Sequence, residues 1–147
     1  MRNGLFAFGL LILVLAVASP GAALAARGKA GEEGTWKVKV TPDAASAAKG
    51  EKEFDDTLVL RKGKFRSTAC EAHGFGEASY RVEGSHWMSD AGSRKEGRNH
   101  WHGEVTGDSV EGQMTWTRAD GSVLNYTFTG SRAGEQPQTR QTRKSGD

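Results

Sequence analysis

The chain has 147 residues, a formal net charge of +2 at pH 7, 36% hydrophobic residues and a single cysteine. This length fits one domain of ordinary size. The near balance of 20 basic and 18 acidic residues gives no electrostatic reason to expect nucleic acid or an anionic membrane surface as a partner. One cysteine excludes a framework of intrachain disulfides and a zinc site built from several thiolates.

The N-terminal residues predict a cleaved export signal. A positive start at Arg2 precedes an apolar run from Leu5 to Ala18, which is shorter than the roughly 20 residues that cross a bilayer as a helix. Ala23-Leu24-Ala25 then supplies the small-x-small pattern that signal peptidase recognises. We therefore expect residues 1–25 to be removed, a secreted or periplasmic protein, and no membrane span after cleavage.

Two polar segments flank the expected folded domain. Residues 26–33 are interpreted as a linker. Residues 133–147 contain no large apolar side chain, so they cannot bury enough surface to offset the entropy of ordering and are predicted to form a disordered tail. The domain itself is predicted over residues 34–132.

Within this domain the dominant pattern is alternation of apolar and polar residues, which is typical of half-buried strands. Eight such runs lie around residues 36–40, 58–60, 65, 78–82, 87, 101–105, 110–116 and 124–128. Gly107-Asp108 and Asp120-Gly121 indicate tight hairpins between the last three. Pro42 to Lys52 is predicted as a long first loop with room for one helical turn, and Asp90 to Gly97 as a second polar loop.

Short sequential strands joined by hairpins predict antiparallel pairing and an all-β fold. We expect an eight-stranded antiparallel up-and-down barrel, because closure removes the exposed edge strands that promote aggregation. A β-sandwich is the alternative architecture.

The ends of this region resemble the calycins, the superfamily of lipocalins, avidins and fatty-acid-binding proteins. Gly34-Thr35-Trp36 is similar to the Gly-x-Trp start of their first strand, and Arg132 to the basic residue that they pack across that Trp. The resemblance covers most of residues 34–132 through two short motifs, whereas the Thr-Asp-Tyr segment of lipocalins is not visible. It implies a closing structural pair of Trp36 and Arg132, and it does not identify a ligand.

The predicted barrel interior is the first candidate site. An eight-stranded barrel is just wide enough to be filled by side chains or to hold one small ligand, so both a packed core and a small apolar or aromatic ligand remain open. The residues expected to line a ligand site are Tyr80, Trp87, Trp101, Met114, Trp116 and Tyr126.

A metal site is the alternative. His100, His102 and Glu104 share one face of a predicted strand, and two imidazoles and a carboxylate suit Zn²⁺, Cu²⁺ or Ni²⁺. The same alternation places them on the barrel exterior, opposite Trp101. A cell-envelope structural or interaction module is the third interpretation.

The remaining candidates predict little chemistry. Cys70 is expected to be buried and inert, since a nucleophilic thiol needs a base or a positive field. The acidic cluster of Asp55 and Asp56 with Glu51 and Glu53 is interpreted as a solvated strand entrance. No nucleophile elbow, phosphate loop or dinucleotide fingerprint is present. The sequence thus predicts a non-enzymatic protein without catalytic residues or cofactor, monomeric or weakly dimeric.

Overall fold

A computed structural model describes residues 31–134, which form a closed barrel of eight antiparallel strands. The strands follow one another around the barrel in chain order, and β8 pairs with β1 to close it. They are β1 (Gly34–Pro42), β2 (Phe54–Arg61), β3 (Lys64–Ser67), β4 (Ala78–Glu83), β5 (His86–Ser93), β6 (Gly97–Thr106), β7 (Ser109–Thr117) and β8 (Val123–Arg132). The up-and-down barrel is confirmed, and the sandwich alternative is wrong.

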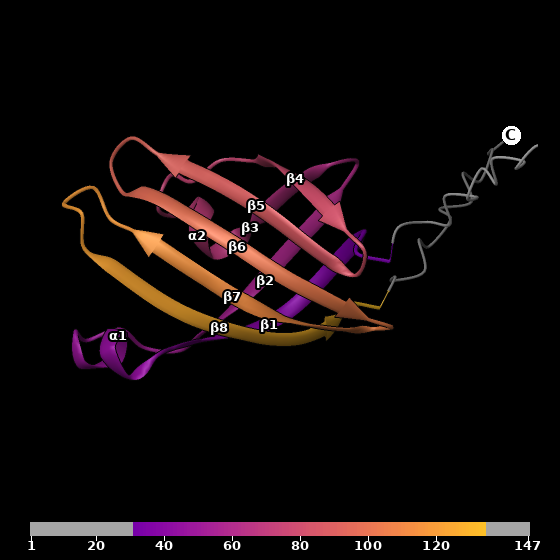
Figure 1. Cartoon of the computed structure of the whole chain (residues 1–147), viewed down its shortest axis with the longest axis horizontal. Coiled ribbons are helices and arrows are strands. Elements are labelled where there is room, and N and C mark those ends of the chain that lie inside the picture. The colour runs from indigo at the N-terminus through magenta and orange to yellow at the C-terminus, as the bar shows by residue number, and fades with distance from the viewer. Residues whose placement is uncertain (1–30, 135–147) are drawn as a thin grey trace, which may run out of the picture.

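Two short helices accompany the strands, α1 (Ala44–Ala48) and α2 (Thr68–Glu71). Both lie at the end of the barrel opposite to the one where β1 begins and β8 ends (Figure 1). We call these the helix end and the Trp36 end. Within residues 31–134 neither helix is long and apolar enough to cross a membrane.

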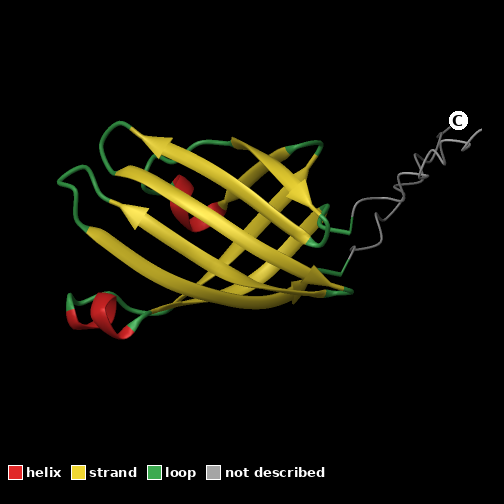
Figure 2. Ribbon diagram, viewed as in Figure 1, coloured by secondary structure: helices red, strands yellow, loops and turns green. Residues whose placement is uncertain are grey.

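The two helices have different places in the barrel (Figure 2). The side chain of Asp43 caps α1. This helix packs against β8, and the Ser46 hydroxyl accepts a hydrogen bond from the backbone N–H of Asn125 at 2.9 Å. This is the helical turn that the first predicted loop allowed. The sequence pattern did not predict α2, whose buried Cys70 reaches Asn99 on β6. Since α2 directly follows β3, this contact shows that it extends across the barrel interior.

The predicted second polar loop is shorter than expected. Strand β5 continues to Ser93 and β6 begins at Gly97, with Asp90 paired to His100 and Ala91 to Asn99. The inward-facing Ala91 is buried. A small side chain on the inner face lets pairing continue through a stretch whose composition alone suggests a loop.

Several sequence predictions lie outside the described residues. These are the signal peptide at 1–25, residues 26–30 of the linker and residues 135–147 of the tail. The described part of the linker contacts the barrel, because the Glu32 carbonyl accepts a hydrogen bond from the Trp36 indole at 2.9 Å.

Candidate ligand-binding site

The Trp36 end of the barrel is filled by aromatic side chains. Trp87 and Trp101 are fully buried and both pack against Phe65, with ring centroids 5.2 and 5.4 Å apart. Phe128 contacts both indoles from β8, at 6.1 and 5.4 Å. These four rings bury a large apolar area and occupy the space that a ligand between Trp87 and Trp101 would need.

A buried carboxylate fixes α2 across the interior. Asp56 faces inward on β2 and is 5% exposed. Its carboxylate accepts hydrogen bonds from the Ser67 hydroxyl at 2.5 Å, the Thr57 amide at 2.6 Å and the Ala69 amide at 2.9 Å. The sequence interpretation of Asp56 as part of a solvated strand entrance is therefore wrong, since alternation places it on the same face as Leu58.

Above α2, at the helix end, the barrel opens into a cavity of about 400 Å³ that we call the mouth pocket. Its wall is mainly aromatic and apolar, with three charged side chains and His73 at the rim. The residues that line it are Glu51, Phe54, Asp55, Ala69, Cys70, His73, Phe75, Met114, Trp116, Arg118 and Tyr126. This volume lies within the range of small-molecule sites.

The rim of the mouth pocket carries an ion pair. Arg118 Nη2 lies 2.5 Å from Glu51 Oε1, and the Tyr126 hydroxyl donates to Glu51 Oε2 at 2.8 Å. The two charged side chains are 38% and 22% exposed. Burial, followed by the Glu51 carboxylate, raises the pKa of Tyr126, so this phenol stays protonated and remains a hydrogen-bond donor.

Trp116 is held in one orientation on the pocket wall. Its indole N–H donates to the Glu96 carbonyl at 2.8 Å. The Arg118 guanidinium lies over its ring, 5.1 Å from the centroid, and Phe75 meets it edge-on at 5.9 Å. A fixed ring beside the cavity is a preorganised contact surface for an apolar ligand.

Cys70 forms part of the pocket floor. Its Sγ accepts a hydrogen bond from Asn99 Nδ2 at 3.3 Å, and burial raises the pKa of the thiol to about 11. At neutral pH the thiol is therefore protonated, and a protonated thiol is a poor nucleophile.

The structure divides the six residues predicted to bind a ligand. Met114, Trp116 and Tyr126 line the mouth pocket, whereas Trp87 and Trp101 belong to the packed Trp36 end. Tyr80 turns toward Glu32, with its hydroxyl 3.4 Å from Glu32 Oε1, and burial raises the pKa of Tyr80 to about 12.

The three residues of the metal hypothesis lie on the outer face of β6, each with its own neighbour. His100 Nδ1 is 2.8 Å from Asp90 Oδ1, and Glu104 accepts from the Ser85 hydroxyl at 3.1 Å. His102 stacks on His86 with centroids 5.2 Å apart. In the described part of the chain, no group of three or more His, Cys, Asp and Glu side chains is arranged to hold a metal ion.

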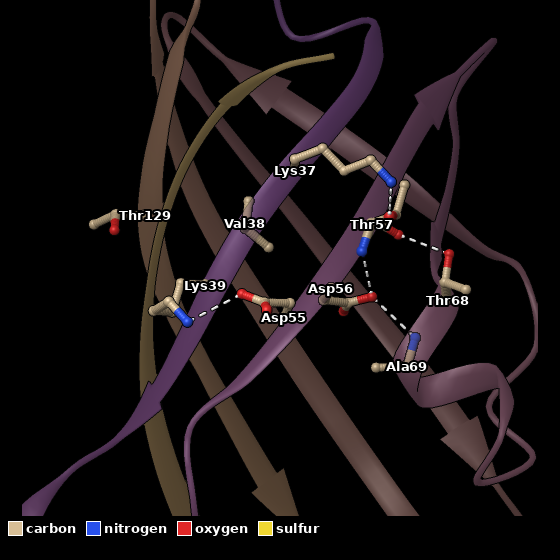
Figure 3. A pocket seen from close by; sticks show the side chains of 9 residues that line it. All are labelled: Lys37, Val38, Lys39, Asp55, Asp56, Thr57, Thr68, Ala69 and Thr129. Carbon is tan, nitrogen blue, oxygen red and sulfur yellow. Dashed lines mark hydrogen bonds and ion pairs between the residues drawn. The ribbon is translucent and has the colours of Figure 1, made fainter.

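A second hollow, of about 560 Å³, lies on the outer face of β1 and β2 beside α2 (Figure 3). Its two lysines on β1 each contact a residue on β2: Lys39 Nζ lies 3.1 Å from Asp55 Oδ1, and Lys37 Nζ donates to Thr57 Oγ1 at 2.8 Å. Because Lys39 and Asp55 are 52% and 83% exposed, this hollow is a solvated strand surface, whereas the wall of the mouth pocket is mainly aromatic and apolar.

Of the charged residues of the mouth pocket, sequence reasoning missed Arg118 and assigned Glu51 and Asp55 to a solvated strand entrance. Arg118 follows Trp116 by two positions, so strand alternation alone could have placed it near the same face. No local sequence pattern places Glu51 in the pocket, because its partners Arg118 and Tyr126 lie 67 and 75 residues further along the chain.

We compared the sequence with protein-family models and with curated proteins, and neither comparison gave a match.

Proposed function

We propose that this chain is an exported, calycin-like barrel that binds a small apolar or aromatic ligand in the mouth pocket and performs no chemistry on it. The observation that carries the proposal is the contrast between the two ends of the barrel. One end is packed with four aromatic rings, while the other holds a cavity of about 400 Å³ with a mainly aromatic and apolar wall and charged side chains at its rim. Such concave, largely apolar sites are the usual places for small ligands.

Two features favour binding over catalysis. The thiol in the pocket is protonated at neutral pH because its pKa is about 11. The polar groups at the rim already contact one another, because Arg118 pairs with Glu51 and the Tyr126 hydroxyl donates to Glu51. This arrangement suits orientation of a ligand.

The calycin-like assignment rests on the closed eight-stranded barrel together with Trp36 and Arg132, which face each other at one end of its closing strand pair. Export rests on the N-terminal sequence, with its apolar run and its Ala23-Leu24-Ala25 cleavage pattern.

The chain contains its own reporters for a binding test. Its four tryptophans give four indole N–H signals in a proton–nitrogen correlation spectrum, and only Trp116 lines the mouth pocket. Titration with 2-acetonaphthone, an uncharged bicyclic aromatic ketone, should shift the Trp116 signal and leave that of Trp36 in place. A Trp116→Phe variant assigns the signal. Saturable shifts centred on Trp36 or Trp87, or no saturable shift, would overturn the proposal.

A pair of variants tests the pocket wall. Phe54 packs edge-on against Tyr126, with centroids 6.1 Å apart, and lines the cavity. Phe54→Ala should weaken ketone binding about tenfold, which corresponds to roughly 1.4 kcal/mol. Val123 is 42% exposed, belongs to the same end of the barrel and is not part of the pocket, so Val123→Ala should leave the affinity unchanged.

A further inference from the structure

We propose that the mouth pocket selects uncharged ligands, with a flat apolar body and one carbonyl-type hydrogen-bond acceptor, over ligands of the same shape that carry a charge. This inference rests on the proposed function and narrows it to a ligand class. It follows from the way in which the charges that face the pocket are already paired.

Each charged side chain of the pocket wall has a partner of opposite sign. Arg118 is paired with Glu51, and Asp55 is paired with Lys39 at 3.1 Å on the outer side of the strand. A carboxylate ligand beside Arg118 would also lie beside Glu51, and an ammonium ligand beside Glu51 would lie beside Arg118. Either ion would lose its hydration without gaining an uncompensated counter-charge, which disfavours binding.

An uncharged acceptor meets no such penalty. A guanidinium group has five N–H donors, and among the described residues the Arg118 side chain donates one hydrogen bond, to Glu51. The spare donors lie beside the aromatic wall, because the guanidinium rests over Trp116. A ligand carbonyl can accept from this fork while the ligand body packs against Phe54 and Met114, which are also part of the wall.

Glu51 fixes the position of the Arg118 side chain and also compensates its positive charge. Its two carboxylate oxygens receive one donor each, from Arg118 and from the Tyr126 hydroxyl. The loop that carries Glu51 follows α1, so this carboxylate links the first loop of the barrel to Arg118, just after β7, and to Tyr126 on β8. Glu51 is therefore the residue that sets the preference for uncharged ligands.

Isothermal titration calorimetry with three ligands of matched shape tests the inference: 2-acetonaphthone, 2-naphthoate and 2-(aminomethyl)naphthalene at pH 7. We expect the ketone to bind at least about tenfold more tightly than either charged compound. If the carboxylate or the amine binds as tightly as the ketone, the charge selectivity is refuted while the proposed binding function stands. If none of the three binds, the proposed function fails and the inference fails with it.

Two variants show whether Glu51 causes the selectivity. Glu51→Gln removes the negative charge next to Arg118 and should raise the affinity for 2-naphthoate about tenfold relative to the ketone. Glu53 lies two residues away, is 62% exposed and pairs with Lys39 at 3.8 Å outside the pocket, so Glu53→Gln is the matched control and should leave the ratio of the two affinities unchanged. An unchanged ratio in Glu51→Gln, or an equal rise in Glu53→Gln, would overturn the role of Glu51.

Discussion

The guanidinium of Arg132 lies over the indole of Trp36, 4.2 Å from the ring centroid, and the two residues are direct partners in the pairing of β1 with β8. The same guanidinium donates to the Glu33 and Gly31 carbonyls, both at 2.5 Å, and to Asp108 Oδ1 at 3.1 Å. One side chain therefore joins the chain before β1, the hairpin between β6 and β7, and the last strand at the Trp36 end.

Replacing Arg132 should destabilise the barrel even when the positive charge is kept. Arg132→Lys retains the charge but loses the planar fork that reaches two carbonyls at once. We expect a loss of about 1–2 kcal/mol for Lys and about 2–3 kcal/mol for Gln, because the Glu33 and Gly31 carbonyls lose a charged donor and the Trp36 ring loses the guanidinium that covers it. Urea unfolding measures both losses.

Arg61 serves as the control for Arg132, since it is exposed at the same end of the barrel. Arg61→Gln should change the free energy of unfolding by no more than about 0.5 kcal/mol. Equal effects of Arg61→Gln and Arg132→Gln would show that net charge, and not the contacts of Arg132, stabilises this end.

The neighbouring residues Asp55 and Asp56 should differ sharply in their contribution to stability. Asp56→Ala leaves the Ser67 hydroxyl and the Ala69 amide without their acceptor, and we expect a loss of about 2–4 kcal/mol. Asp56→Asn keeps an acceptor oxygen and should cost less. Asp55 has an exposed side chain, so Asp55→Ala should fall within about 0.5 kcal/mol of the wild type in the same urea unfolding experiment. Similar losses at the two positions would contradict the buried network.

The sequence predicted the barrel because its alternation is nearly complete. In β7 and β8 the buried residues Val110, Met114, Leu124, Tyr126 and Phe128 recur with the two-residue period of a strand. The two hairpin signals fall between β6 and β7 and between β7 and β8. Repetition over so many residues makes strand and turn predictions robust.

The alternation of apolar and polar residues gives a wrong prediction of burial where a polar residue faces the barrel interior. Asp56 follows the alternation of β2 yet is polar, and its burial depends on donors from Ser67 and Ala69 that only the folded chain brings together. Helix α2 spans four residues, which is too short to produce a helical period. Because α2 could not be predicted, the sequence could not show that the Trp36 end is filled and that the helix end is hollow.

Gly112 is required by the close packing of the barrel wall. A Cβ atom at this position would lie 2.1 Å from the His102 carbonyl oxygen and 2.6 Å from Cζ of Phe128. Because the first of these neighbours is backbone, relief requires the strands to move apart. We expect Gly112→Ala to cost about 3 kcal/mol or more, measured by thermal or urea unfolding.

Gly76 provides the comparison for Gly112. A Cβ atom there would meet no atom within 4 Å, and its φ is not positive. Gly76→Ala should therefore be neutral or slightly stabilising, because alanine restricts the unfolded chain. A small effect at Gly112 would mean that β6 and β7 can separate at low cost.

The buried thiol of Cys70 should make the stability of the barrel fall at alkaline pH. Burial raises the pKa of this thiol from 9.0 to about 11, so the folded state favours the neutral form. The resulting stabilisation is fully present below about pH 9, where the thiol is protonated in both states, and it is lost as the pH rises toward 11. A shift of this size corresponds to roughly 2–3 kcal/mol.

Comparison of the wild type with Cys70→Ala isolates this contribution, because other groups that titrate at alkaline pH, Tyr80 and Tyr126 among them, are present in both proteins. The difference in unfolding free energy between the two proteins should decrease by about 2 kcal/mol or more between pH 8 and pH 11. Alkylation of the native wild type by iodoacetamide at pH 8 should also be far slower than alkylation in urea, since the thiolate is the reactive form. The opposite outcome is a difference in unfolding free energy that stays constant across this pH range, together with rapid alkylation of the native protein. That result would show that Cys70 is exposed to solvent at the pocket floor and that α2 does not seal the barrel interior beneath the mouth pocket.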